Sequence, residues 1–517
     1  MWNESGSVRK DPGGKLNVAL VYPNTYWVGM SNLGLQQMYR LLNNHPGMLC
    51  ERFFTDSPRS VESDRALQDF HIIAFSISYE LDYIEAIKIL KANHVPVSAR
   101  DRRGKPIVMA GGAAITSNPE PIADALDICF LGDGEPLPSI LYESYAAGSG
   151  YEDFLDRLSL VPGVYIPSRM HPIYKEGVIA GFEGSMPRLS HADPLDDPAC
   201  TSIITKDTAF GDMYLIEIAR GCPFSCKFCS AREIYSPYRA VALTILEPVF
   251  AEAARHRGKV GLVSTSLNNH PEAPAMFREM RDRGLKVAPP SLRPGMIGND
   301  LLQALAESQV KGVTLAPETG SEKLRYALGK RITNAVILED IRALVTVGIR
   351  DIKLYFMVGL PGETLANLDE TVDLIKRIRQ IFIQVSKGNK KIGSLTVSIN
   401  AFVPKPHTPY ERQPMAEPDE AKAHIKRIEK ALKGESNITV SFEGPKWAFL
   451  QGLIARGDRK LLGLIVELAG HYASAWQRLL KQWPLNPDYY ALRERDENEV
   501  LPWSFYSTGC VKDSGHD

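Results

Sequence analysis

The sequence has no excess of charge, few cysteines and no long apolar run. Its 517 residues hold 60 Lys and Arg against 61 Asp and Glu, a formal net charge of −1. A chain without surplus positive charge has no general electrostatic attraction for nucleic acid or an anionic membrane. No apolar stretch is long enough to span a bilayer, and the N-terminus has no basic segment followed by an apolar run. We therefore expect a cytoplasmic protein.

The seven cysteines do not form a disulfide framework. Four of them are scattered singly along the chain, at Cys50, Cys129, Cys200 and Cys510. Widely spaced single thiols are typical of a reducing compartment. A lone thiol in a tail, such as Cys510, is usually inert, and a role as hydrogen donor or ligand is the alternative.

The other three cysteines lie in one short loop, Cys222, Cys226 and Cys229, with the spacing Cys-x3-Cys-x2-Cys. Thiolates are soft ligands that suit iron-sulfur clusters and zinc. Three thiolates on a four-iron cube leave one iron without a protein ligand, and an open coordination position usually serves chemistry. A structural zinc site is the alternative, but it needs a fourth Cys or His close by, and His270 and Cys200 lie in other segments.

The N-terminal third alternates apolar, β-branched runs with helical patterns. Strands are expected at 15–22, 71–78, 106–110 and 127–131, with helices at 33–42 and 82–93 between them. This alternation predicts a Rossmann-like, doubly wound parallel sheet. Ligands of such sheets bind beyond the carboxyl ends of the strands, where residues 76–80, 111–114 and 132–135 supply polar and glycine-rich loops.

The region that follows is less regular. Residues 163–166 and 177–180 flank a polar turn and predict a small hairpin, and residues 187–198 are polar and proline-rich, as in a linker. We divide the chain into a sheet domain (1–150), a hairpin and linker (151–205), a barrel (206–415) and a helical C-terminal region (416–517).

The barrel is predicted from six strand candidates separated by amphipathic helices. The strands are at 213–220, 259–265, 286–290, 312–316, 351–358 and 395–402. Repeated strand-helix units predict a partial parallel (β/α)6 barrel with its functional residues at the carboxyl ends of the strands. The cysteine loop follows the first strand directly, so it lies at such an end.

The cysteine spacing, the aromatic Phe228 before the last cysteine and the barrel around them resemble the radical SAM superfamily. The resemblance implies a 4Fe-4S cluster on Cys222, Cys226 and Cys229 that binds S-adenosylmethionine at its open iron. It also implies an external electron donor, such as a flavodoxin or ferredoxin, and cleavage to methionine and a 5'-deoxyadenosyl radical.

The same resemblance suggests which residues hold S-adenosylmethionine. Glu318 would reach the ammonium or ribose, Arg331 the carboxylate, and the turn at Gly359 and Pro361 would lie against the adenine. The further candidates are Phe228, Ser264 and Arg293. Alternatively, the Glu318 carboxylate could interact favourably with the dipole of the helix that follows it, and Arg331 could be a solvent-exposed basic residue at a helix end. The Gly-Gly-Glu that the superfamily usually has after the second strand is replaced by Val-Ser-Thr-Ser. Recognition of the ammonium group would therefore depend more on Glu318.

The N-terminal domain resembles the cobalamin-binding-type domain that precedes many radical SAM domains. The matching features are Tyr22-Pro23, Leu-Gly-Leu at 33–35, Gly111-Gly112, Thr-x-Asn-Pro-Glu at 116–120, Asp127 and Gly-Asp-Gly-Glu at 132–135. The Asp-x-His-x-x-Gly motif with the cobalt-ligating histidine is missing. The implied cobalamin contacts are Ser76, Ser78, Tyr79, Gly111, Gly112, Gly134 and Glu135. A Rossmann-like domain without cofactor is the alternative.

Three functions fit these features. The first is methyl transfer to an unactivated carbon, with cobalamin carrying the methyl group. The second is a cobalamin-independent radical rearrangement or cyclisation, with the N-terminal domain as a scaffold. The third is a non-catalytic iron-sulfur sensor or partner-binding protein. The substrate, a small molecule or a peptide, is not indicated by any residue pattern.

Overall fold

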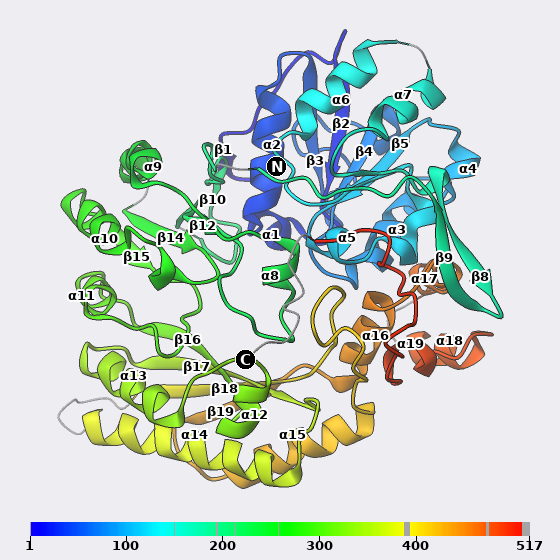
Figure 1. Cartoon of the computed structure of the whole chain (residues 1–517). Helices are drawn as coiled ribbons and strands as arrows, with labels where there is room; N and C mark the ends of the chain where they lie inside the picture. The colour runs from blue at the N-terminus through cyan, green and yellow to red at the C-terminus, as the bar shows by residue number, and fades with distance from the viewer. Residues whose placement is uncertain are drawn as a thin grey trace.

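The structure, a computed structural model, describes residues 2–148, 150–192, 195–211, 213–256, 258–386, 393–471 and 475–508. Cys510 lies outside the described residues. The N-terminal sheet domain and the barrel lie side by side, and the C-terminal helices lie next to both (Figure 1). Among the described helices, none has the length and apolar character needed to cross a membrane.

The N-terminal domain is built on a six-stranded sheet of order β3-β2-β4-β5-β6-β7. The strands are β2 (Leu16–Val21), β3 (Met48–Phe53), β4 (Ile72–Ser76), β5 (Ile107–Gly111), β6 (Ile128–Phe130) and β7 (Val164–Tyr165). All pairs are parallel except β6 with β7. The predicted doubly wound sheet is therefore confirmed. Its strand order reverses between β2 and β4, which is where ligands of such sheets bind.

Helices cover both faces of this sheet because its strands are apolar on both sides. Leu16, Val18 and Leu20 face one core, with α2 (Leu33–Asn44), α6 (Leu137–Ala146) and α7 (Tyr151–Leu158). Ala19 and Val21 face the other, with α3 (Asp82–Ala92) and α5 (Ala113–Ser117). Parallel sheets covered on both faces have such continuous hydrophobic strands.

A hairpin is present, but its first strand is not formed by the residues that the sequence predicted. The antiparallel hairpin consists of β8 (Met170–Lys175) and β9 (Val178–Gly184). Residues 163–166, expected to form its first arm, instead supply β7, which pairs with β6. This pairing satisfies backbone groups that would otherwise be left open at the edge of the large sheet. The hairpin prediction is therefore wrong for this arm.

The barrel contains all six predicted strands and one more. The parallel strands are β11 (Tyr214–Glu217), β14 (Lys259–Val263), β15 (Lys286–Ala288), β16 (Gly312–Glu318), β17 (Asp351–Val358), β18 (Ser394–Ala401) and β19 (Ile438–Phe442). A bridge between Leu292 and Leu315 joins its two sheets. The seventh strand, β19, comes from the C-terminal region, where only helices were expected.

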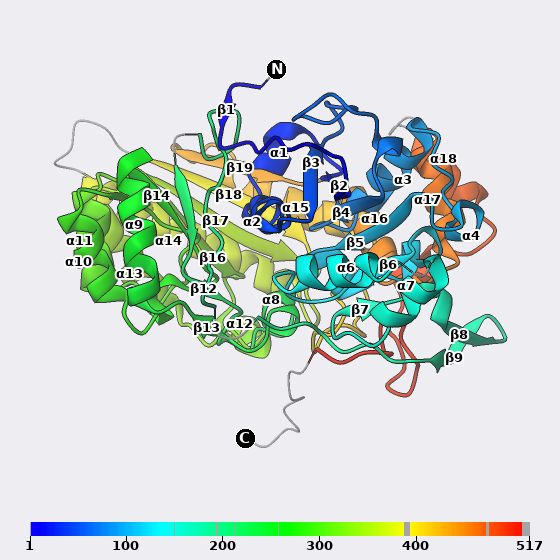
Figure 2. The ribbon, with the colours of Figure 1, turned by 90° about the horizontal axis from the view of Figure 1, so that it is seen from above.

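Six helices cover the barrel strands. They are α9 (Leu243–His256), α10 (Ala273–Asp282), α11 (Asn299–Glu307), α13 (Asn334–Thr346), α14 (Leu365–Ser386) and α15 (Pro418–Leu432). Their buried apolar side chains form one core with those of the strands. The open side of the barrel faces the N-terminal domain, with α2 lying at the boundary (Figure 2).

The C-terminal helices are α16 (Pro445–Ala455), α17 (Leu461–Ala469), α18 (Trp476–Gln482) and α19 (Asp488–Ala491). α17 packs against α3 and the 3-10 helix η2 (Glu120–Ala125), and α16 contacts both β18 and α15. Buried Trp503, Phe505 and Tyr506 belong to the same core as the N-terminal sheet. The two ends of the chain therefore share one hydrophobic core.

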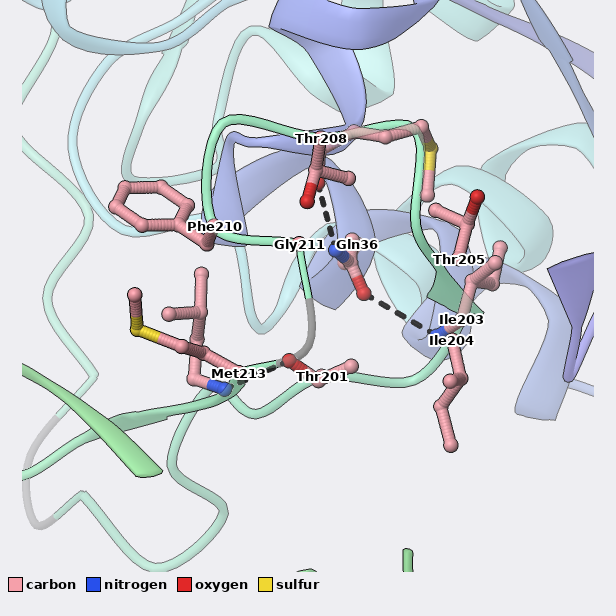
Figure 3. A pocket seen from close by; sticks show the side chains of 11 residues that line it. Gln36, Thr201, Ile203, Ile204, Thr205, Thr208, Phe210, Gly211 and Met213 are labelled. Carbon is pink, nitrogen blue, oxygen red and sulfur yellow. Dashed lines mark hydrogen bonds between the residues drawn. The ribbon is translucent and has the colours of Figure 1, made fainter. Parts of the chain in front are cut away.

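The segment between the two large domains is fixed by α2. Gln36 donates from Nε2 to the Met30 carbonyl at 2.9 Å, and its Oε1 accepts from the backbone N–H groups of Ser202 (3.0 Å) and Ile203 (3.2 Å). Figure 3 shows Gln36 pointing from its helix into this segment. β10 (Ile204–Thr205) pairs with β1 (Glu4–Ser5) directly beyond it. The first barrel strand is thus held against the N-terminal sheet.

Candidate active site

The cysteine loop lies at the carboxyl end of the first barrel strand. β11 ends at Glu217, and β12 (Ala219–Arg220) then pairs with β13 (Arg239–Ala240). Gly221 and Cys222 follow directly, and Cys229 is the residue before α8 (Ser230–Ile234). A Cβ at Gly221 would lie 2.5 Å from the carbonyl oxygen of Tyr235, so only glycine fits where the loop turns away from the strand.

Segments after three other barrel strands hold the loop in place. Thr265, beyond β14, donates to the Gly221 carbonyl at 2.5 Å. The Lys227 N–H donates to the Leu328 carbonyl at 2.9 Å, and the Lys227 carbonyl accepts from Tyr410 N–H at 3.1 Å. Leu328 follows α12 (Glu322–Ala327), and Tyr410 lies beyond β18. The loop is therefore anchored to the barrel mouth along its length.

The three thiols form a donor set that fits a cluster. All three are free and partly exposed. The pKa of Cys229 is raised to about 11, mainly by burial; the backbone hydrogen bond from Ala231 opposes this shift, and the neighbouring Cys226, Cys222 and Glu318 add to it. No three His, Cys, Asp or Glu side chains among the described residues converge on a single metal ion. A cube takes its thiolates on different irons, so its ligands need no such convergence.

Glu318 lies at the end of β16 in an unusual backbone conformation. Its φ is +68°, which L side chains rarely adopt, and its side chain is buried. Lys330 binds it with Nζ 2.8 Å from the Glu318 carboxylate and also donates to the Ala316 carbonyl at 2.5 Å. Sequence reasoning missed Lys330 and chose its neighbour Arg331. Arg331 is exposed and forms no ion pair within the described part of the chain.

Phe228 packs against an apolar cluster that includes one residue of the turn predicted to lie against adenine. A small apolar cluster at the barrel mouth joins Leu324, Leu328, Leu360 and Phe402, with Phe228 packed against it. Gly359 has φ +72°, and its N–H donates to the Glu363 carboxylate at 2.7 Å. Leu360 lies between Gly359 and Pro361, so the structure brings three of the predicted S-adenosylmethionine residues to one place.

Arg293 is also at the cysteine loop. Its Nη1 lies 3.5 Å from the Sγ of Cys226, and its guanidinium stacks 3.8 Å from the ring centre of Phe224. Arg293 follows the bridge at Leu292, so it comes from the third strand end, as the sequence predicted. Its side chain is engaged with the loop itself.

A cavity of about 510 Å³ lies between the N-terminal sheet and the barrel. Six of the seven predicted cobalamin residues line it, and so does Ser264 at the end of β14. These six are Ser76, Ser78, Gly111, Gly112, Gly134 and Glu135. Tyr79 is outside this lining; burial raises its pKa, and Glu443 beyond β19 raises it further. Residues 219–221, which lead into the cysteine loop, form part of the wall.

The cavity is apolar at depth and polar at its rim. Val18, Leu20, Met109 and Phe130 line it from the sheet, and Leu42, Leu137 and Leu141 line it from α2 and α6. At the rim, Asn32 donates to Ser78 Oγ at 3.1 Å. Such a site suits a large ligand with an apolar body and polar edges.

An ion network connects this cavity to the cysteine loop. Arg220 pairs with Asp133 at 2.9 Å, Glu135 at 2.7 Å and Glu217 at 2.8 Å. Arg239 reaches the other oxygen of Asp133 at 2.6 Å. The acids of the Gly-Asp-Gly-Glu loop are therefore held by the residue two positions before Cys222. Sequence reasoning gave no role to Arg220, because its partner Glu135 lies 85 residues away and Asp133 is two residues further.

Family comparisons match two parts of the chain. Residues 34–167 match the family described as radical SAM proteins, N-terminal, and residues 216–375 match the radical SAM superfamily. An uncharacterised protein of Methanocaldococcus jannaschii is 30% identical over 451 residues, which covers 86% of this chain and 89% of that protein. A ribosomal protein uS12 methylthiotransferase of Caldanaerobacter subterraneus is 21% identical over 271 residues, covering 50% of this chain and 58% of that protein.

Solved structures share the fold at low identity. The radical S-adenosylmethionine methyltransferase TsrM from Kitasatospora setae, with cobalamin and a [4Fe-4S] cluster bound, has a TM-score of 0.52 and 14% identity, covering 77% of this chain and 74% of that one. The cobalamin-dependent enzyme OxsB, with aqua-cobalamin and S-adenosylmethionine bound, has a TM-score of 0.54 and 13% identity, covering 84% and 66%. Both family matches and the relative from Methanocaldococcus establish that the chain belongs to the radical SAM superfamily, and it shares its overall fold with the cobalamin-dependent members TsrM and OxsB.

Proposed function

We propose that this radical SAM enzyme cleaves S-adenosylmethionine at a 4Fe-4S cluster held by Cys222, Cys226 and Cys229, and that it transfers a methyl group to an unactivated carbon with cobalamin as the methyl carrier. The cavity between the sheet and the cysteine loop is the observation that carries this proposal. It supports a second large cofactor because its wall contains both the predicted cobalamin residues and the residues leading to Cys222.

The barrel mouth would supply the contacts for S-adenosylmethionine. When bound, the cluster supplies one electron and an open iron to this substrate. Glu318, held in place by Lys330, presents a carboxylate for the ammonium or the ribose hydroxyls. Exposed Arg331 could donate two parallel hydrogen bonds to the methionine carboxylate. The turn at Gly359 and Pro361, whose middle residue Leu360 shares an apolar cluster with Phe228, would lie against adenine. Ser264 lines the cavity.

The cavity residues would hold cobalamin without a histidine ligand. Its apolar depth would exclude water from the appended base, and its rim, with Ser76, Ser78, Gly134 and Glu135, would face the polar edge of the ring. Glycines at 111 and 112 let the ligand approach the strand ends closely. The proposal includes a cytoplasmic location and an external electron donor such as a flavodoxin or ferredoxin.

The proposal is tested by anaerobic purification from cells supplied with cobalamin, followed by absorption spectra and a cleavage assay with dithionite. We expect iron, cobalt and S-adenosylmethionine turnover in the same protein. Cleavage to 5'-deoxyadenosine without bound cobalamin would favour radical rearrangement or cyclisation. A bound cluster without any cleavage would favour a sensor or partner-binding protein.

A side chain that fills the cavity should affect the binding of cobalamin without affecting the binding of the cluster. A Cβ at Gly111 would have only ordinary contacts, 3.5 Å from the Phe130 carbonyl oxygen, so a larger side chain there projects into free space. We expect Gly111→Leu to lose cobalt but keep iron. Gly181→Leu in the β8–β9 hairpin, where nothing lies within 4 Å of the added Cβ, is the control and should keep both.

The three loop cysteines are tested together. Replacing all of them by Ala should abolish iron binding after anaerobic reconstitution, because no thiolate would remain in the loop. Cys200→Ala, a partly buried thiol outside the loop, is the control. Iron retained at the wild-type level in the triple variant would show that the cluster is bound elsewhere.

A further inference from the structure

We propose that Arg293 is a positioning residue for the cluster, which acts through the Cys226 thiolate and makes the cluster easier to reduce. This inference rests on the proposed cluster at the three cysteines. It differs from the role that the sequence suggested, a contact to S-adenosylmethionine.

The guanidinium of Arg293 is directed at a thiol and held there by a ring. Nη1 is 3.5 Å from the Sγ of Cys226, within the range of a hydrogen bond to sulfur, and the guanidinium lies 3.8 Å from the ring centre of Phe224. Phe224 and Cys226 belong to the same loop. The N–H groups of a guanidinium lie in its own plane. When the guanidinium stacks on an aromatic ring, these N–H groups point beyond the edge of the ring and remain free to donate.

The backbone that carries Arg293 is fixed on both sides. The Leu292 N–H donates to the Thr314 carbonyl at 2.8 Å, and Leu292 bridges to Leu315 of β16. The Gly295 N–H donates to the Asp340 carboxylate at 2.6 Å, which ties the other side of Arg293 to α13. The position of the guanidinium is therefore set by the barrel, before any ligand binds.

The positive charge of Arg293 is directed mainly at the cysteine loop. Within the described residues, no carboxylate lies within ion-pair distance of its guanidinium, whereas Arg220 and Arg239 are both paired with acids. Reduction adds an electron to a centre that the thiolates already make negative. A fixed cation and a hydrogen bond to a ligand sulfur stabilise the reduced state more than the oxidised state.

The test is a redox titration of the reconstituted protein, monitored by electron paramagnetic resonance in the absence of S-adenosylmethionine. For Arg293→Met, we expect the equilibrium constant for one-electron reduction to fall about tenfold, equal to a shift of about 59 mV to lower potential. Arg293→Lys keeps the positive charge, so it should lower the potential by less than half as much. Iron content and affinity for S-adenosylmethionine should stay within twofold of wild type.

Arg65→Met is the matched control, because Arg65 stacks on Phe70 at 4.2 Å in the N-terminal domain, away from the loop. It should leave the potential unchanged. If Arg293→Met does not fold, Phe224→Leu removes the stacking ring and should lower the potential in the same direction. An unchanged potential in the variant that folds would overturn the inference, and a loss of affinity for S-adenosylmethionine beside it would favour a contact to that ligand instead. Absence of a cluster in the wild-type protein would instead refute the proposed function.

Discussion

Two adjacent basic residues, Lys330 and Arg331, have different surroundings. Lys330 is 5% exposed and its ammonium is bound by Glu318 and the Ala316 carbonyl, whereas Arg331 is exposed. The ion pair fixes the Glu318 carboxylate at the strand end, where backbone geometry is already unusual. Lys330 therefore prepares the site, and Arg331 is the residue left free to meet a ligand.

We expect Lys330→Met to lower the free energy of unfolding by about 3 to 5 kcal/mol, because it leaves the Glu318 carboxylate buried without its cation. Urea unfolding of the apoprotein measures this. Arg331→Met is the control and should change stability by less than about 0.5 kcal/mol. Equal urea midpoints for the two variants would contradict this difference between the neighbours.

Asp340 gives a prediction on pH. Burial raises the pKa of Asp340 to about 6, the Gly295 N–H opposes this shift, and nearby Glu339 adds to it. The folded state therefore holds a proton that the unfolded state has lost, so stability falls as pH rises from about 4 through 6. Asp340→Asn keeps an acceptor for Gly295 and should remove this part of the pH dependence.

The measurement compares thermal midpoints at pH 5 and pH 7.5. Wild type should lose about 1.4 kcal/mol more stability than Asp340→Asn between these values, because about one pH unit separates pH 5 from the pKa of Asp340. Glu339→Gln, an exposed neighbour on the same helix, should keep most of the wild-type pH dependence. Identical pH profiles of wild type and Asp340→Asn would refute the assignment.

At the scale of elements, the Thr-x-Asn-Pro-Glu segment (116–120) docks the C-terminal region. Asn118 Nδ2 donates to the carbonyls of Ala455 (3.0 Å) and Gly457 (2.9 Å). Arg459 pairs with fully buried Glu120 at 2.9 Å and donates to the Tyr165 hydroxyl at 2.5 Å. The segment and the Gly-Asp-Arg motif at 457–459, which the sequence shows as unrelated signatures, are the two halves of one contact.

We expect Arg459→Met to destabilise the protein by about 3 to 5 kcal/mol, because Glu120 would remain buried without its partner. The readouts are the urea midpoint and the rate at which a protease releases the C-terminal region. Arg427→Met is the matched control: Arg427 pairs with Asp369 at the same distance of 2.9 Å, but on the surface between α14 and α15. Its removal should have no measurable effect, and a similar loss in both variants would contradict the argument from burial.

At the scale of the whole molecule, the C-terminal region packs against both the N-terminal domain and the barrel. The C-terminal helices cover α3 and η2 of the N-terminal domain and also contact the barrel at β18. The cavity is bounded by the N-terminal sheet on one side and by the cysteine-loop strand on the other. Both the core and the candidate site therefore depend on contacts between segments hundreds of residues apart.

We expect residues 1–205 alone to aggregate, because they expose the apolar surface of α3 and η2 that α17 covers. Co-expression with residues 443–517 should make them soluble, and Arg459→Met in the second fragment should weaken the rescue. The measurement is the soluble fraction after centrifugation, followed by size-exclusion chromatography. A soluble, cooperatively melting fragment 1–205 would show that the N-terminal domain is independent of the C-terminal region.

The sequence by itself determined the local elements and the ligand type. Apolar runs and helical periods predict the parallel strands of both domains because these signals act over a few residues. The spacing of Cys222, Cys226 and Cys229 predicts a three-thiolate site because all three sulfurs come from one loop. The six cavity residues were also predictable, since loops at the carboxyl ends of parallel strands share one edge.

Only the tertiary structure decided which distant groups meet. The choice between Lys330 and Arg331 depends on burial, which sequence spacing does not fix at a helix end. Pairing of Arg220 with Asp133 and Glu135, of Arg293 with Cys226, and of Asn118 with the C-terminal region requires strands and loops from different parts of the chain to come together. The addition of β19 to the barrel edge depends on an unpaired neighbouring strand, β18, which becomes available only once the barrel has formed.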